Sequence, residues 1–162
     1  PLMGESFLAN VIWVAFFAIL AVAVVLFIRY KSIKVIIPVM ITAISELFLI
    51  LGFAALVQWN LDMAAFAGIL AAVGTGVDDQ IVILDETIKG SDVGSGWKEK
   101  MKKAFFIIFV AYATTVAAMV PLWNAGAGLI RGFALTTIAG VTIGVFLTRP
   151  AFAAIVEKMF KE

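Results

Sequence analysis

The sequence contains no cysteine and no histidine in its 162 residues. Without cysteine the chain can form no disulfide and no thiolate metal site, and without histidine it lacks the commonest metal ligand and proton shuttle. Carboxylates, hydroxyls and backbone groups remain, so we expect no metal and no cofactor. Charged residues are also scarce, at 14% against 64% hydrophobic residues. This composition excludes an ordinary soluble domain. The lysines and arginines are spread between the apolar runs and form no basic face, so we expect no nucleic-acid partner.

What the sequence does contain is long apolar runs. A hydrocarbon core needs about 20 residues per helix, and five runs are long enough: Phe7–Ile28, Val35–Val57, Met63–Leu84, Ala104–Leu122 and Leu129–Ala153. The sequence therefore predicts an all-α, polytopic membrane bundle of five transmembrane helices. The short Gly/Ser-containing stretch Lys89–Gly96 marks no second domain, so we expect a single transmembrane domain over residues 1–162.

The basic residues predict the orientation of the bundle. They follow the first, third and fifth runs, as Arg29, Lys31 and Lys34, then Lys89, Lys98, Lys100, Lys102 and Lys103, then Arg149, Lys158 and Lys161. The other two connections contain only Arg131. Because cytoplasmic loops are enriched in Lys and Arg, we expect the N-terminus outside and the C-terminus inside. Trp59 and Trp123 then lie at the outer interface and Trp97 at the inner one.

Acidic residues inside the apolar runs form the candidate functional site. Asp78 and Asp79 are adjacent in the third run, and Glu46 lies in the second. An ionisable residue at bilayer depth costs about 2.5–3.5 kcal/mol on insertion scales and usually serves ion or proton movement. Neighbours on a helix point about 100° apart, so we expect one aspartate to face the pathway. Desolvation and a neighbouring carboxylate favour the protonated acid, which suits a proton carrier.

Several polar residues are predicted to share the depth of these acids. Counted along each helix from its basic end, the members of this layer lie about 16–18 Å into the membrane: Glu46, Asp78, Thr114 and Thr137. Thr115 lies beside Thr114. The threonines are proton-relay candidates, or they simply bond a carbonyl of their own helix. We expect no Lys or Arg at this depth, so an ionised acid needs water, hydroxyls or a partner subunit.

Glycines accompany the acids and recur on the last run. Gly74 lies one turn before Asp78, where a missing side chain would admit a helix or water, and Gly76 lies between them. Gly140 and Gly144 form a GxxxG pattern, as do Gly128 and Gly132. Such patterns indicate close helix contact, so packing is the default interpretation of all these glycines.

The third run carries a family resemblance. Gly74-Thr75-Gly76-Val77-Asp78-Asp79-Gln80-Ile81-Val82-Ile83-Leu84-Asp85-Glu86 resembles the fourth-helix motif of the SecD family, especially its archaeal form. It is similar to the bacterial pattern G-x-x-V-D-A-N-V-L-I-F-E-R, with Asp78 on the intramembrane aspartate. Asp79 departs from that pattern and matches the register of SecF, so either aspartate can be the working one. Pro1–Glu5 and Arg131–Ala134 resemble flanking segments of the family.

This resemblance implies a function that the residues alone do not. The five spans would be helices two to six of SecD, half of a bundle of the RND superfamily, in a fragment without the first helix and the external domain. The family pairs with SecF and serves the Sec translocation channel, and its proton flow drives domain movements that pull exported polypeptides outward. The resemblance therefore implies a multi-pass protein of the cytoplasmic membrane whose missing counter-charge comes from SecF.

Two other functions share features of this sequence. Gly74-Thr75-Gly76 followed by aspartates resembles the GxGD motif of intramembrane aspartyl proteases, but the spacing is wrong by one residue. Those enzymes also need a second catalytic aspartate, whereas only Glu46 shares the depth of this pair, so we expect no enzyme. A structural or assembly module, in which the acids hold a complex together, stays open as the alternative.

Overall fold

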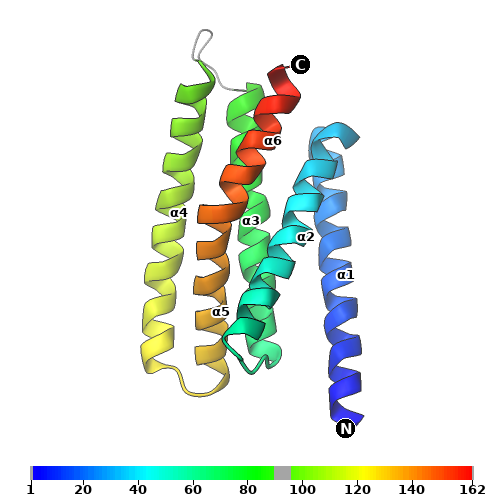
Figure 1. Cartoon of the computed structure of the whole chain (residues 1–162), viewed down its shortest axis with the longest axis vertical. Coiled ribbons are helices and arrows are strands. Elements are labelled where there is room, and N and C mark those ends of the chain that lie inside the picture. Colours follow the sequence, from blue (N-terminus) through cyan, green and yellow to red (C-terminus); the bar gives the residue numbers. More distant parts are fainter. Residues whose placement is uncertain (1, 90–95, 162) are drawn as a thin grey trace.

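The computed structural model describes residues 2–89 and 96–161, and the regular structure there is helical. The first four helices are α1 (Leu2–Tyr30), α2 (Ile33–Leu56), α3 (Met63–Lys89) and α4 (Trp97–Ala125). The last rod of the bundle is continuous and consists of α5 (Leu129–Ile143), the π-helix η1 (Gly144–Thr148) and α6 (Arg149–Lys161). The rods run side by side, and the two termini lie at opposite ends (Figure 1).

The predicted spans are confirmed in number, and their bounds differ most at the start of the fourth and the end of the fifth. Within the described residues, five helices are long and apolar enough to cross a membrane: Ala9–Tyr30, Ile33–Leu56, Met63–Ile88, Trp97–Ala125 and Leu129–Phe160. The fourth begins at Trp97 instead of Ala104, because the intervening Lys, Glu and Met residues are good helix formers. The fifth continues past Ala153 to Phe160. The predicted loop before the fourth span lies mostly outside the described residues.

Helix α3 is the centre of the bundle and α1 lies at its edge. α3 packs against α1, α2, α4 and the α5–η1–α6 rod, whereas α1 packs on α2 and α3 (Figure 1). Half of the span of α3 is buried inside the protein, against 6% of the span of α1. The polar residues of α3 are therefore the ones placed to act inside the bundle.

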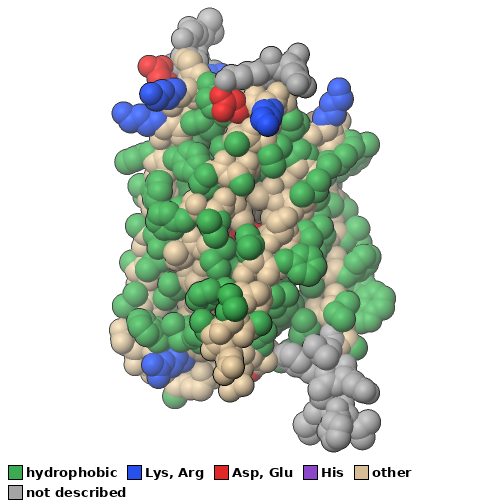
Figure 2. All heavy atoms as spheres, viewed as in Figure 1, with side chains coloured by type: hydrophobic (Ala, Val, Ile, Leu, Met, Phe, Trp, Pro, Cys, Tyr) green, Lys and Arg blue, Asp and Glu red, His purple; other side chains and the backbone are tan. Residues whose placement is uncertain are grey.

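Charged side chains gather at the ends of the bundle. Figure 2 shows hydrophobic side chains over the middle of the visible face, with most of the blue basic side chains at the end where the C-terminus lies. At that end Asp85 of α3 accepts hydrogen bonds from Arg29 and from Tyr30 Oη, the latter at 2.9 Å. Lys103 Nζ of α4 lies 3.3 Å from Glu86 Oε2. These contacts fasten α1 and α4 to α3 at this end.

Small residues let α3 and α5 approach closely. An added Cβ at Gly140 would lie 2.4 Å from Cβ of Ala72, so the two helices meet here without intervening side chains. The predicted close contact at Gly140 is confirmed. The second predicted pair is wrong for Gly128, which has no atom near its Cβ position and instead adopts a φ of +58° before α5. Glycine is favoured there for its backbone freedom, not for packing.

We predict that Gly140→Ala destabilises the bundle by about 1–3 kcal/mol, the usual cost of forcing an extra group into a packed core. The new methyl group would overlap Ala72 and push α5 away from α3. The measurement is the free energy of unfolding of the purified protein in bicelles. The matched control is Gly52→Ala, because Gly52 has nothing within 4 Å of its Cβ position. Equal stabilities of the two variants would contradict the close contact.

Candidate functional site

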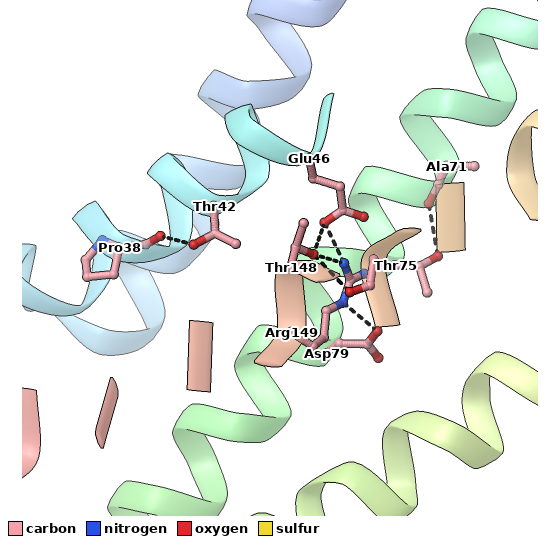
Figure 3. Close-up of polar contacts among 9 residues, drawn as sticks. Pro38, Thr42, Glu46, Ala71, Thr75, Asp79, Thr148 and Arg149 are labelled. Carbon is pink, nitrogen blue, oxygen red and sulfur yellow. Dashed lines mark hydrogen bonds and ion pairs between the residues drawn. The ribbon is translucent and has the colours of Figure 1, made fainter. Parts of the chain in front are cut away.

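Three helices bring four polar side chains together inside the bundle. They are Glu46 from α2, Asp79 from α3, Thr148 from η1 and Arg149 from α6, all of them buried. Figure 3 shows these side chains pointing toward one another, with the guanidinium of Arg149 between the two carboxylates. Two acids predicted from separate runs therefore share one site. The basic residue between them was not predicted.

Arg149 joins the two carboxylates through different nitrogen atoms. Its Nη1 donates to Oε2 of Glu46 at 2.5 Å, and its Nε donates to Oδ2 of Asp79 at 3.1 Å. The Arg149 side chain is completely buried. A buried charge costs several kcal/mol unless it is paired and hydrogen-bonded. The network therefore ties α2, α3 and α6 together at a point where none of the three charges meets bulk water.

Thr148 adds a hydroxyl to the Glu46 side of the network. Its Oγ1 accepts from Nη1 of Arg149 at 2.6 Å and lies 3.0 Å from Oε2 of Glu46. The same oxygen is 3.1 Å from the carbonyl of Gly144. A hydroxyl has one hydrogen to donate, so Thr148 can donate to the carboxylate or to the carbonyl at any moment. The protonation state of Glu46 decides which acceptor is better.

The π-helix explains why two consecutive residues both point inward. In η1 the N–H of Arg149 bonds the carbonyl of Gly144, five residues back. The wider turn gives each residue less rotation about the axis than the 100° of an α-helix, so Thr148 and Arg149 reach the same site. π-bulges of this kind are rare and often occur at functional sites. Pro150 follows at once and has no N–H to donate.

Two glycines make room for the guanidinium. An added Cβ at Gly144 would lie 2.2 Å from Nη1 of Arg149, and one at Gly76 would lie 2.6 Å from Nη2. The Gly76 position is also 2.8 Å from Oε2 of Glu46. The default interpretation of these two glycines as helix packing is thus replaced by a more specific one, space for an ion network. Gly74 differs, since nothing lies within 4 Å of its Cβ position.

The absence of a basic residue at this depth was a wrong prediction. The sequence places Arg149 at the cytoplasmic end because its fifth apolar run finishes at Ala153. The helix continues to Phe160, eleven residues and about 16 Å beyond Arg149, so that the arginine lies inside the span. The apolar residues after Pro150 were the signal that could have revealed this.

The other predicted residues are not part of the network. Asp78 is exposed on the outer surface of α3, although Asp79 beside it is buried. Thr114 and Thr115 both donate to the carbonyl of Ala111 on their own helix. Thr137 Oγ1 lies 2.8 Å from the carbonyl of Phe133 on its own helix and 3.4 Å from that of Gly68 on α3, and its one hydrogen can go to either. The predicted depth of Thr137 is counted from Arg149 as the edge of the membrane. Because Arg149 lies inside the span, Thr137 lies farther from the cytoplasmic end than predicted.

The network contains two carboxylates and one guanidinium. With both acids ionised its net charge is −1, and with one proton bound it is neutral. A low-dielectric interior strongly favours the neutral arrangement. Arg149 fixes both carboxyl groups, so the net charge of the site depends on whether one of them carries a proton.

Comparisons with known proteins agree on one family. A family model described as "Protein export membrane protein SecD/SecF, C-terminal" matches residues 1–160. A protein-export membrane protein SecD from Methanocaldococcus jannaschii is 53% identical over 100% of this chain, and one from Methanothermobacter thermautotrophicus is 48% identical over 97%. One from Thermococcus gammatolerans is 45% identical over 97%. The chain spans 40%, 41% and 31% of the lengths of these relatives.

Proposed function

Because the chain belongs to the SecD/SecF C-terminal family of protein-export membrane proteins, we propose that it couples proton movement to the export of polypeptides. In this proposal it works in the cytoplasmic membrane beside a SecF-type partner and the Sec translocation channel. The N-terminus faces outward and the basic end faces the cytoplasm, as the distribution of Lys and Arg indicates. The exported polypeptide is the cargo, and no hydrolytic chemistry is assigned to the acids.

The observation that carries the proposal is that the buried network has two carboxyl groups but only one guanidinium. Glu46 and Asp79 share Arg149 through different nitrogen atoms, so loading and releasing one proton changes which carboxylate the guanidinium holds most tightly. The three charged residues sit on α2, α3 and α6. A change in pairing therefore acts on the relative positions of three helices. A proton crossing 100 mV supplies about 2.3 kcal/mol, enough to shift a conformational equilibrium about fifty-fold.

The two aspartates are assigned different tasks. Asp79 is the proposed carrier, because it is buried against Arg149. Asp78 is exposed at the same depth and has no ion-pair partner among the described residues. A charge facing hydrocarbon is costly, which favours a protein surface over Asp78 in the assembled complex. We assign Asp78 to the contact with the SecF-type partner.

The alternative of a structural module draws on the same network. A buried arginine that ties three helices also serves to fix the fold, and buried ionic groups sometimes act mainly in specificity. The two functions differ in whether they tolerate a neutral amide of the same shape in place of the acid. A structural role tolerates an amide that keeps the hydrogen bonds, whereas a proton carrier does not.

The test is the replacement Asp79→Asn in the full-length protein, assembled with its partner. We predict at least a tenfold loss of the export that depends on the proton-motive force, because the amide cannot take up and release a proton. Asp78→Asn is the matched control at the neighbouring residue. It should weaken partner binding but retain more export than Asp79→Asn does. Both are measured at equal membrane abundance and with complex assembly checked.

Unchanged export in the Asp79→Asn variant would overturn the carrier assignment. Replacing either aspartate could instead reduce the amount of assembled complex while the export per assembled complex stays normal. That result would favour the structural module. Loss of export with normal assembly only in Asp78→Asn would move the carrier to that residue.

A further inference from the structure

Four polar atoms at the core of the bundle lack a protein partner within the described residues. They are Oε1 of Glu46, Nη2 of Arg149, and Oε1 and Nε2 of Gln80. Gln80 is completely buried on α3, and its amide is not part of the ion network. An unpaired buried polar atom costs about 1–3 kcal/mol, so four of them in one region require an explanation.

The two unpaired atoms of the ion network lie against one turn of α3. The Cβ position of Gly76 is 2.6 Å from Nη2 of Arg149 and 3.0 Å from Oε1 of Glu46, so both unpaired atoms touch the same turn of α3. Gln80 is one turn further along that face, with its Cβ about 5–6 Å from the Gly76 position. Side chains on a helix lean back toward its N-terminus, and this leads the Gln80 side chain toward Gly76. From this geometry we expect the amide to face the two unpaired atoms of the network.

The chemistry of the four atoms matches that of water. Nη2 of Arg149 and Nε2 of Gln80 are donors, while Oε1 of Glu46 and Oε1 of Gln80 are acceptors. A water molecule accepts two hydrogen bonds and donates two, and buried waters commonly make about three bonds to groups that are otherwise unpaired. We propose that Gln80 closes a buried water-binding site against Glu46 and Arg149.

This site deepens the proposed function and rests on it for its role in transport. Glu46 is completely buried, so a proton needs a hydrogen-bonded route to reach its carboxyl group. Water held by Gln80 gives Oε1 of Glu46 such a neighbour, while Oε2 is held by Arg149 and Thr148. Gln80 is in this view a positioning residue: its amide holds the water, and the water exchanges the proton with Glu46.

The test is the near-isosteric replacement Gln80→Met, measured as the unfolding midpoint of the purified protein in nanodiscs. Loss of the bridging water should lower the midpoint, because Glu46 and Arg149 each lose a bonding partner. Without a water site, the replacement removes a buried unpaired amide and should raise the midpoint. A raised or unchanged midpoint therefore overturns the proposal. A midpoint raised by NaCl but not by an equal concentration of KCl would place a sodium ion there and also overturn it.

A second measurement does not depend on the stability of the variant. High-resolution cryo-electron microscopy of the unmodified, partner-assembled protein should show density within hydrogen-bonding distance of the Gln80 amide and Oε1 of Glu46. A direct Gln80–Glu46 contact would overturn the site. In transport, Gln80→Met should lower proton-driven export several-fold with Asp79 intact. If Asp79→Asn exports normally, the assignment of Asp79 as the proton carrier fails, while the density and the unfolding midpoint still decide whether the water site exists.

Discussion

Replacing Arg149 by leucine is expected to lower the free energy of unfolding by about 3–5 kcal/mol, the usual cost of removing one partner from a buried ion pair. The reason is specific to this site. Glu46 and Asp79 both depend on Arg149, and without it two buried carboxyl groups remain with no positive charge between them. Both acids must then bind protons or draw in water. The variant should also lose proton-driven export, because no pairing remains to be switched.

The measurement is unfolding in bicelles together with export at matched abundance. Arg149→Lys keeps the charge but presents a point charge instead of a planar fork, so it cannot reproduce bonds from both Nε and Nη1. We expect it to recover only part of the stability. The triple variant Glu46→Gln, Asp79→Asn, Arg149→Leu removes every charge of the network and should be more stable than Arg149→Leu alone. Wild-type stability in Arg149→Leu would show that the arginine does not neutralise these acids.

Gly144→Ala is the second substitution with a large expected effect. The added methyl group would lie 2.2 Å from Nη1 and 2.6 Å from Cζ of Arg149, too close for the guanidinium to stay in place. Displacing it breaks its bonds to Glu46 and Thr148 at once. We expect a loss of about 2–4 kcal/mol, since broken buried pairing is added to the cost of overpacking.

Gly74→Ala is the matched control for this variant. It also lies in a transmembrane helix near the acids, but its Cβ position has nothing within 4 Å. Alanine there should be neutral or slightly stabilising, because it favours the helix more than glycine does. The pair of variants separates crowding of Arg149 from a general intolerance of larger residues. Equal losses in both would count against the space-making role of Gly144.

The bundle could be predicted from sequence because it depends on signals that are local. Each span is a run of apolar residues, and the predicted third span, Met63–Leu84, lies within the observed α3, Met63–Lys89. The acids Glu46 and Asp79 were found in the same way, since a charge inside an apolar run stands out. The family motif around Asp78 and Asp79 is likewise continuous in sequence, and the family assignment is confirmed.

The network itself could not be predicted, because it depends on contacts between distant residues. Glu46 and Arg149 are 103 positions apart, and no periodicity within either helix reveals their pairing. The π-helix adds a second difficulty. It changes the direction in which Thr148 and Arg149 point, so a regular α-helical projection of the fifth span misplaces everything after Gly144. The choice between Asp78 and Asp79 as the buried residue also required the packing around α3.

The position of α1 makes the mechanical stiffness of the protein uneven. Its polar ties are at one end, where Arg29 and Tyr30 hold Asp85. Further along, α1 faces α2 and α3 across an apolar cavity of about 100 Å³. Apolar contact has no preferred direction, so sideways displacement of α1 there meets little resistance, whereas displacement of α2 against α3 strains the Arg149 network. A force applied to this chain would tilt α1 about its tethered end before it disturbed the core.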